Sequence, residues 1–326
     1  MINAVVGIDI GGTSTKFGIV DKKGECLGLS AIRTRQFRSL NGFIEHLYKE
    51  IQTLISSLNE DIQIKGVGIG APNGNYFRGT IEHAPNLVWK GVVPLVKKFK
   101  KNFPAIPVVL TNDAKAAALG EMLYGGAKNM KDFVVITLGT GMGSAFVFDG
   151  RLVYGHDGLA GELGHVNVKQ NGRACRCGNR GCLETYVSAT GIRRTFLNLL
   201  RSGSEKSALR NVSFNELTSK TIYDAARKGD VVARQAFIIT GEILGIKLSD
   251  VVAITNPEAI FILGGLAQAR DLIFKPTRRS LEDHLFPIFR RKIKILPSQL
   301  KRENAAILGA GALAWGELNI SSTSKK

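Results

Sequence analysis

A histidine and three cysteines form the most specific candidate site in the sequence. His165 stands ten residues before a run that contains Cys175, Cys177 and Cys182, so three of the four cysteines fall within eight positions of the 326-residue chain. Cysteines this close cannot easily form unstrained disulfides. One imidazole and three thiolates complete a tetrahedral ligand set for zinc and leave no position for a catalytic water. The spacing predicts a structural zinc ion, and the alternative is four unrelated reduced thiols.

Two glutamates lie just outside this cysteine loop. Glu162 precedes His165 by three residues, and Glu184 follows Cys182 by two. A loop stiffened by a metal ion, with carboxylates and an imidazole on it, suits bidentate hydrogen bonds to the vicinal hydroxyls of a sugar. We therefore expect Glu162, His165 and Glu184 to bind a sugar, with zinc acting through geometry and not as a Lewis acid.

Two glycine-rich turns could hold phosphate groups. Residues 11–13 read Gly-Gly-Thr after a strand pattern that ends at Asp9 and Ile10, and residues 139–143 read Gly-Thr-Gly-Met-Gly after a second strand pattern. Backbone N–H groups in such turns can cradle phosphate oxygens, Thr13 and Thr15 add hydroxyl donors, and Asp9 could hold Mg²⁺ through a water. The first turn is neither a P-loop nor a dinucleotide fingerprint, and by itself it also fits a plain hairpin. The second turn favours a nucleotide between two domains, with adenosine against Gly264-Gly265.

Asn112 and Asp113 lie between a buried strand pattern and a helix pattern. One interpretation is a helix cap, which is a common role for either residue. The pair also follows the carboxyl end of a strand, where ligand sites gather in α/β folds. There Asp113 could accept the proton of a hydroxyl that attacks phosphorus, as a general base in phosphoryl transfer.

The elements that position these residues alternate between strands and helices, which predicts an α/β fold. Hairpins are expected at residues 5–21 and 134–149, and their shared plan of strand, glycine-threonine turn and returning strand predicts a duplicated domain. Further buried strands are expected at 66–70, 108–110 and 259–263. Helical periodicity covers 42–58, 114–123, 222–226 and 233–255. Residues 201–220 are expected to form an exposed insertion, and the final Ser-Ser-Thr-Ser-Lys-Lys a frayed tail.

Composition limits the class of protein. The chain is 44% apolar, with no window approaching 18 consecutive apolar residues and no basic leader, so we expect neither a membrane span nor a signal peptide. Clustered thiols favour the reducing cytoplasm. The formal net charge is +17, from 44 Lys and Arg against 27 Asp and Glu. Because these basic residues are spread along the chain, a solvated surface that attracts anionic ligands is favoured over a nucleic-acid partner.

Four motifs together resemble the ROK family (repressors, open reading frames and sugar kinases), and within it the bacterial glucokinase group. They are Asp9-Ile10-Gly11-Gly12-Thr13, Asn112-Asp113-Ala114, Glu162-x-Gly164-His165 and the cysteine run from Cys175 to Glu184. The resemblance implies a two-domain actin/hexokinase-like ATPase fold, with ribonuclease H-like duplicated domains and a cleft between them. It also implies dimers or tetramers, and a C-terminal helix near 305–315 that packs on the first domain.

The same resemblance implies a role for each matched residue. Asp113 is the base that activates the sugar 6-hydroxyl, and His165 divides its two nitrogens between zinc and the sugar. The sugar-binding set is Asn86, Asn112, Asp113, Glu162, His165 and Glu184. The set for ATP and Mg²⁺ is Asp9, Gly11, Gly12, Thr13, Lys16, Thr140, Gly141, Gly264 and Gly265. The zinc set is His165, Cys175, Cys177 and Cys182.

The sequence thus predicts an ATP-dependent hexose kinase, with glucose 6-phosphorylation favoured. Expected domains are residues 1–112 with a helix at about 303–318, residues 113–302, and a flexible tail at 319–326. Alternatives are a kinase for fructose, allose or N-acetylmannosamine, a non-catalytic sugar sensor, or a structural zinc protein; the donor could be ATP or polyphosphate. Family repressors carry a winged helix-turn-helix before the first hairpin, and because only four residues precede Val5 we expect that module to be absent.

Overall fold

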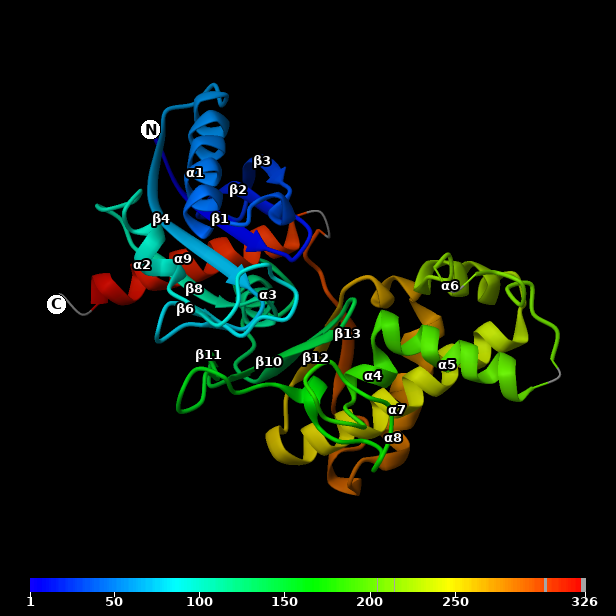
Figure 1. Cartoon of the computed structure of the whole chain (residues 1–326). Coiled ribbons are helices and arrows are strands. Elements are labelled where there is room, and N and C mark those ends of the chain that lie inside the picture. The colour runs from blue at the N-terminus through cyan, green and yellow to red at the C-terminus, as the bar shows by residue number, and fades with distance from the viewer. Residues whose placement is uncertain (204, 214, 302–303, 324–326) are drawn as a thin grey trace. The chain divides into compact units, whose positions relative to one another are not determined.

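The chain forms two compact units (Figure 1). The computed structural model describes residues 1–203, 205–213, 215–301 and 304–323. Unit 1 contains Met1–Met130, Arg151–Gly161 and Ser298–Lys326, and unit 2 contains Lys131–Gly150 and Glu162–Pro297.

Unit 1 is built on a five-stranded sheet in the order β3-β2-β1-β4-β8. Its strands are β1 (Ile2–Ile10), β2 (Thr15–Asp21), β3 (Cys26–Ile32), β4 (Ile62–Ala71) and β8 (Val108–Asn112). The first three pair antiparallel, and β1, β4 and β8 pair parallel. Its helices are α1 (Leu40–Ser56), α2 (Leu95–Phe99), α3 (Asp113–Tyr124) and α9 (Ala305–Thr323). Shorter pieces are β5 (Gly74–Asn75), β6 (Thr80–Glu82), β7 (Val92–Val93), β11 (Arg151–Leu152) and a 3₁₀ turn at Thr34–Gln36.

Helices cover this sheet because each buries one apolar face. In α1, Phe43, Leu47 and Ile51 recur every four residues and are fully buried. The long α9 lies along β1 and β4 (Figure 1). Its close approach needs glycine in the strands, since a β-carbon at Gly68 would overlap the Ala310 carbonyl oxygen. The predicted packing of the C-terminal helix on the first domain is confirmed.

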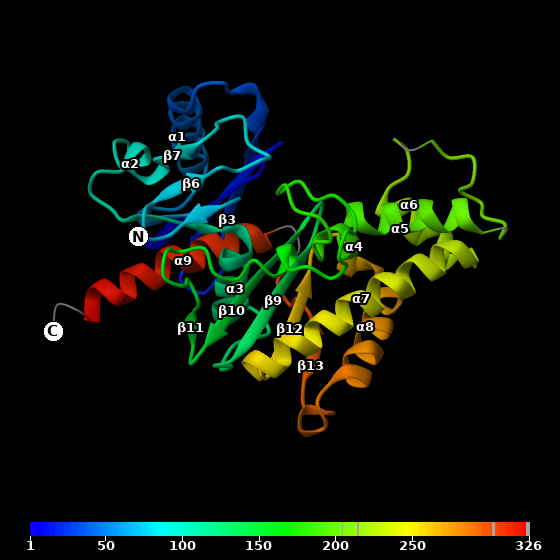
Figure 2. The same ribbon diagram turned by 60° about the horizontal axis from the view of Figure 1, so that its bottom comes forward.

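Unit 2 repeats the plan with strands in the order β10-β9-β12-β13. These are β9 (Phe133–Leu138), β10 (Met142–Phe148), β12 (Ala259–Leu263) and β13 (Lys294–Pro297). The helices are α4 (Glu184–Val187), α5 (Ala189–Ser202), α6 (Ser219–Arg227), α7 (Val231–Thr255) and α8 (Asp271–His284). Short 3₁₀ turns span Leu163–His165, Leu266–Ala269 and Pro287–Phe289. Helices α7 and α8 run side by side (Figure 2).

The two units share one topology. In each, an antiparallel hairpin (β1/β2 or β9/β10) is followed by two further strands. The first of these (β4 or β12) pairs parallel with the first strand of the hairpin, and the second (β8 or β13) pairs parallel with β4 or β12. This confirms the duplicated plan, and the predicted hairpins, strands and helices are all present. Several elements had not been predicted; the longest are β3, α5 and α8, and the shorter ones are α2, α4, β5, β6, β7, β11 and β13. Helix α8 contains Pro276, which breaks the periodicity signal.

The compact units divide the chain differently from the predicted domains. The expected boundary after residue 112 falls inside unit 1, because α3 packs on α9. Residues 151–161 also belong to unit 1. The C-terminal helix begins at Ala305 and continues to Thr323, so most of the predicted tail at 319–326 is helical; residues 302–303 and 324–326 lie outside the described residues.

The described residues of the predicted insertion at 201–220 are largely exposed; residues 204 and 214 lie outside the described residues. It is nevertheless attached to unit 2. Leu217 is buried, and the Ser207 hydroxyl donates a 2.7 Å hydrogen bond to Asp230.

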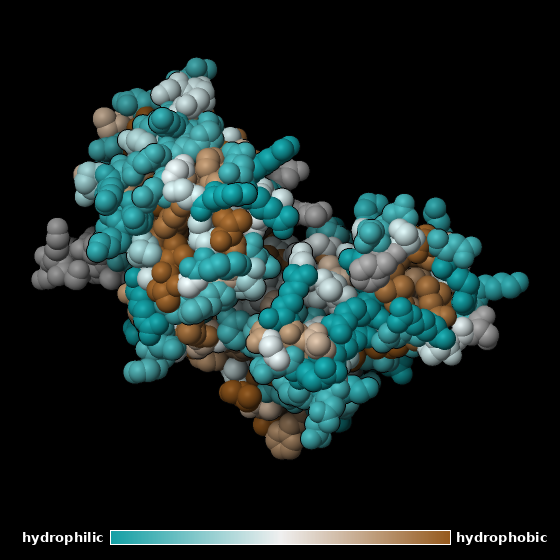
Figure 3. Space-filling view, viewed as in Figure 1, coloured by the Kyte–Doolittle hydropathy of each residue, from teal (hydrophilic) through white to brown (hydrophobic). Residues whose placement is uncertain are grey.

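The face of the molecule drawn in Figure 3 is mainly hydrophilic. On this face, hydrophobic side chains lie in small separate groups among polar ones. Among the described helices, none combines the length and the apolar character that crossing a bilayer requires.

Candidate active site

Asn112 and Asp113 lie where β8 ends and α3 begins. The Asn112 side-chain oxygen accepts the N–H groups of Ala114 at 2.9 Å and of Lys115 at 3.4 Å, so the helix-cap interpretation holds for Asn112. One oxygen of Asp113 also accepts the Ala114 N–H, at 2.8 Å. Among the described residues, neither the NH₂ group of Asn112 nor the second oxygen of Asp113 takes part in these cap bonds, so both can meet a ligand.

The pKa values of two carboxyl groups in unit 1 are raised together. Solvent reaches the Asp113 side chain, but protein atoms crowd its carboxyl group, and this desolvation raises the pKa of Asp113 above its ordinary value. Desolvation, and after it the negative charge of Asp113, raise the pKa of Asp9 to about 6. The two carboxylates are therefore close enough to repel each other.

Two basic residues oppose this repulsion. Lys16, directly opposite Asp9 in the β1/β2 hairpin, lowers the pKa of Asp9. Lys115, two residues after Asp113 in α3, lowers the pKa of Asp113. Lys115 was not among the predicted site residues; it is almost completely buried and donates to the Gly158 carbonyl at 3.1 Å. The sequence signal that could have indicated Lys115 was its position two residues after Asp113 in a helix pattern rich in alanine, where a buried lysine is unusual.

The first glycine turn is tight and lies against Asn86. The Gly11 N–H donates to the Ser14 carbonyl at 3.0 Å, so that donor is used within the turn. A β-carbon at Gly12 would overlap the Asn86 carbonyl oxygen, so glycine is required for this approach. Thr13 is exposed at the turn. The structure thus brings together two parts of the predicted site that lie far apart in the sequence.

One predicted donor of this turn is wrong. Thr15 is buried, and its hydroxyl lies 2.8 Å from that of Thr34. Its side chain therefore serves the core of unit 1 and not a ligand. Arg35, which had not been predicted, places its Nε 3.2 Å from the Gly12 carbonyl oxygen and adds positive charge beside the turn.

The second glycine turn is fixed by neighbours from three elements of unit 2. The Met142 N–H donates to Glu184 at 3.0 Å, and a β-carbon at Gly141 would overlap the same carboxylate. The Thr190 hydroxyl donates to the Thr140 carbonyl at 2.9 Å. Gly264 has φ +101° and lies against the backbone of Leu138, directly before the turn. Thr140, Gly141 and Gly264 are therefore neighbours, and Gly265 follows on the exposed surface.

The predicted metal ligands are gathered in unit 2. The candidate ligand atoms of His165, Cys175, Cys177 and Cys182 all lie within 4.8 Å of one another. Cys177 Sγ is 3.7 Å from Cys182 Sγ, and Cys175 Sγ is 3.8 Å from His165 Nδ1. A tetrahedral zinc ion with Zn–S distances of about 2.3 Å separates its ligand atoms by about 3.8 Å. The four residues therefore fit a tetrahedral metal ion.

Glu184 connects this cluster to the second glycine turn. One of its oxygens accepts the Met142 N–H, and the other lies 3.7 Å from Cys175 Sγ. Glu162 precedes the 3₁₀ turn Leu163–His165, and its carbonyl oxygen accepts the His165 N–H at 3.0 Å. With His165 Nδ1 toward Cys175, its Nε2 is left for another partner.

The predicted residues divide between the units. Unit 1 holds Asp9, Gly11, Gly12, Thr13, Lys16, Asn86, Asn112 and Asp113. Unit 2 holds Thr140, Gly141, Glu162, His165, Cys175, Cys177, Cys182, Glu184, Gly264 and Gly265. Each unit thus carries one glycine turn and part of the predicted sugar-binding set.

Comparison with known proteins identifies the fold and the family. A crystal structure of a ROK family glucokinase from Streptomyces griseus, in complex with glucose and AMPPNP, matches 96% of this chain and 99% of its own, with a TM-score of 0.80 and 32% identity. The fold is the two-domain actin-like ATPase fold, as predicted. A glucokinase from Thermotoga maritima is 35% identical over 315 residues, 95% of this chain and 96% of that protein. A xylose repressor from Caldicellulosiruptor bescii is 28% identical over 97% of this chain and 79% of its own length.

The ROK family model matches residues 5–317. The chain belongs to the ROK family.

Proposed function

We propose that this protein is an ATP-dependent hexose kinase that transfers the γ-phosphoryl group to the 6-hydroxyl of glucose. The observation that carries the proposal is Asp113, a carboxylate of raised pKa at the start of α3 with one oxygen left for a ligand. Similarity to glucokinases, at 32–35% identity over most of the chain, supports it.

Asp113 acts as the general base. A carboxylate with a raised pKa takes a proton from an alcohol more readily than an ordinary one, provided that it is ionised at the working pH. The NH₂ group of Asn112 donates to a sugar hydroxyl beside it. Asn86, Glu162, His165 and Glu184 bind the remaining hydroxyls.

The glycine turns bind the donor. Gly11, Gly12, Thr13 and Lys16 in unit 1, and Thr140 and Gly141 in unit 2, hold phosphate oxygens, while Gly264-Gly265 receives the adenosine. Asp9 holds Mg²⁺ through a water, and the ion supplies positive charge that offsets the negative charge of the phosphates. Water must be excluded during transfer, because otherwise ATP would be hydrolysed.

Zinc is the metal that we propose for the His165 cluster. A closed set of three thiolates and one imidazole is typical of structural zinc and leaves no open position. Its task is to fix Glu184 and the Nε2 of His165 for the sugar. Because thiolate ligands need reducing conditions, we place the protein in the cytoplasm. From the family resemblance we expect a homodimer or homotetramer. The spread of basic residues along the chain argues against a nucleic-acid partner.

The test of this function is a coupled kinase assay with ATP and Mg²⁺ across a panel of hexoses, together with Asp113→Asn. We expect turnover with glucose, and a loss of at least about a hundredfold in kcat in the variant, because the general base is removed. Calorimetry should show that the variant still binds glucose. Asp61→Asn, an exposed acid of the same unit, is the matched control and should keep full activity.

The outcomes separate the alternatives. Faster turnover of fructose, allose or N-acetylmannosamine would change the substrate and leave the mechanism intact. Sugar binding without turnover on any hexose would instead indicate a sugar sensor. Retained turnover in Asp113→Asn would remove Asp113 from the role of base.

A further inference from the structure

Helix α5 carries a basic face that the proposed kinase reaction does not use. Its outward residues Thr190, Arg193, Arg194, Asn198 and Arg201 follow the three- and four-residue spacing of one helix face. The opposite face, with Ile192, Thr195 and Phe196, is buried in the core of unit 2.

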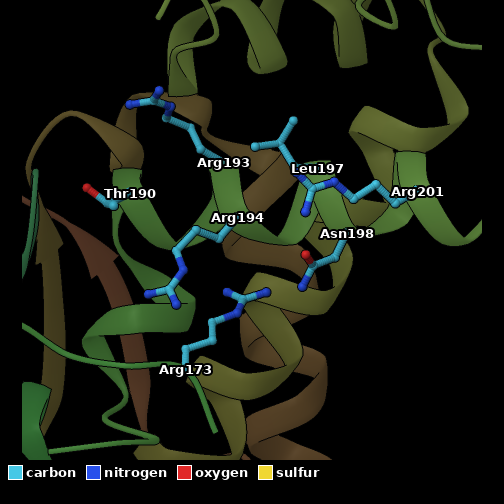
Figure 4. A pocket seen from close by; sticks show the side chains of 7 residues that line it. All are labelled: Arg173, Thr190, Arg193, Arg194, Leu197, Asn198 and Arg201. Atoms are coloured by element: carbon cyan, nitrogen blue, oxygen red, sulfur yellow. The ribbon is translucent and has the colours of Figure 1, made fainter. Parts of the chain in front are cut away.

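This face lines a pocket of about 430 Å³, together with Arg173 from the cysteine loop (Figure 4). Four arginines therefore line one hollow. None of the residues that line it, all of which lie in the described part of the chain, is acidic. An anion bound among these guanidinium groups would relieve their mutual repulsion.

The base of the pocket is rigid. The Arg173 guanidinium donates to the carbonyls of Thr185 at 2.8 Å and Gly191 at 3.1 Å and to the Thr195 hydroxyl at 3.0 Å. It also stacks over the Tyr186 ring, 4.4 Å from the centroid. Its charge is thus held in place before any ligand arrives, which lowers the entropic cost of binding.

Arg194 is oriented in the same way but keeps donors for a ligand. One of its terminal nitrogens donates to the Ala174 carbonyl at 3.0 Å. The guanidinium fork has five N–H donors, so most remain for an anion. Figure 4 shows the Arg194 and Arg173 guanidinium groups on the same side of α5, with Asn198 and Arg201 further along the helix.

We propose that this pocket is a second anion site, which binds a small polyanion bearing at least two phosphate groups. Arginine forks match phosphate oxygens bidentately, and several forks around one hollow suit a diphosphate better than a single carboxylate. The ligand is an inorganic or sugar-linked polyphosphate of small size, since the volume accommodates such a molecule and not a folded protein segment.

The site adjoins the second glycine turn, so the experiment must separate it from the donor site. Thr190, at one end of the pocket, donates to the Thr140 carbonyl. The measurement is calorimetric titration of the full chain with inorganic pyrophosphate at constant ionic strength. It is done once alone and once with a non-hydrolysable ATP analogue and Mg²⁺ saturating the donor site.

We expect pyrophosphate to bind once per chain in both titrations. The variant Arg194→Gln/Arg201→Gln should lose at least about tenfold in affinity. The matched control Arg279→Gln/Arg290→Gln removes the same charge from two exposed positions of unit 2 and should bind as the wild type does. Normal kcat for glucose in both variants shows that they are folded.

Three results would overturn the proposal. Displacement of pyrophosphate by the ATP analogue would assign the arginines to the donor site. Equal weakening in the two double variants would indicate diffuse attraction by the net charge. Absence of binding in the wild type would leave the arginines a purely structural role. Titration with a sugar bisphosphate then distinguishes inorganic from sugar-linked ligands.

Discussion

At the scale of single residues, the chemistry of this protein depends on carboxyl groups whose charges are costly. Asp9 and Asp113 repel each other and are both desolvated, and Lys16 and Lys115 offset part of that cost.

One prediction concerns the pH dependence of catalysis. Removing the positive charge in Lys115→Met should raise the pKa of Asp113 further. Because the base must be ionised, activity would then be lost at a higher pH, and the acidic limb of the kcat/KM profile for glucose should move up by about 1 pH unit. Lys131→Met, at an exposed lysine of unit 2, is the control. An unmoved acidic limb would show that Lys115 does not act on the base.

Another prediction concerns stability. The folded-state pKa of Asp9 is about 6, against an ordinary value of 3.8, so between these values the folded state binds more protons than the unfolded state. Stability from this group therefore falls as pH rises from about 4 to 6, and stays reduced above 6. Asp9→Asn, which cannot ionise, should raise Tm by about 3 °C or more at pH 8 and by less at pH 5, while kinase activity falls.

Thermal unfolding without added Mg²⁺ measures this effect. Asp283→Asn, at an exposed position of α8, should show no such pH-dependent gain. A gain of equal size at pH 5 and pH 8 would mean that the charge of Asp9 is not the cause.

At the scale of elements, the cysteine loop is the segment whose geometry most needs support. Loop residues 166–181 are mostly exposed, and few apolar side chains anchor them. The clustered ligand atoms and Arg173 connect the loop to α4 and α5. Loss of the metal should therefore disturb Glu184 and His165, and with them the sugar site.

Cys177→Ser tests this connection. We expect zinc content to fall from about one ion per chain to well below that, Tm to fall by at least about 5 °C, and KM for glucose to rise more than KM for ATP. Cys26→Ser is the matched control, since Cys26 lies in unit 1 and its Sγ donates only to the Gly28 carbonyl among the described residues. Full zinc content in Cys177→Ser would contradict the assigned ligand set.

At the scale of the whole molecule, the net charge of +17 should favour anionic substrates over neutral ones. Raising the ionic strength from about 0.05 M to about 0.3 M shortens the range of this attraction. We expect kcat/KM for MgATP to fall about threefold or more, while KM for uncharged glucose stays constant. Steady-state assays in KCl measure both, and equal salt effects on the two substrates would argue against electrostatic steering.

Much of this molecule was determined by the sequence alone, because the relevant signals are local. Hairpins with glycine turns, strand-to-helix junctions and a cysteine cluster are each set by residues within about ten positions of one another. These local patterns predicted the family, both hairpins and the helix cap at Asn112.

Only the tertiary structure decided which distant residues meet. In the structure Asn86 lies against Gly12, and Glu184 contacts both the cysteine cluster and the second turn. Lys115 acts on the charge of Asp113. Thr15 faces Thr34 in the core and does not serve the phosphate turn. Helix α3 belongs to unit 1, although the predicted boundary assigned it to the second domain. The arginine face of α5 became visible only in the structure. The physical reason is that packing and mutual electrostatics act between chain segments that no local pattern relates.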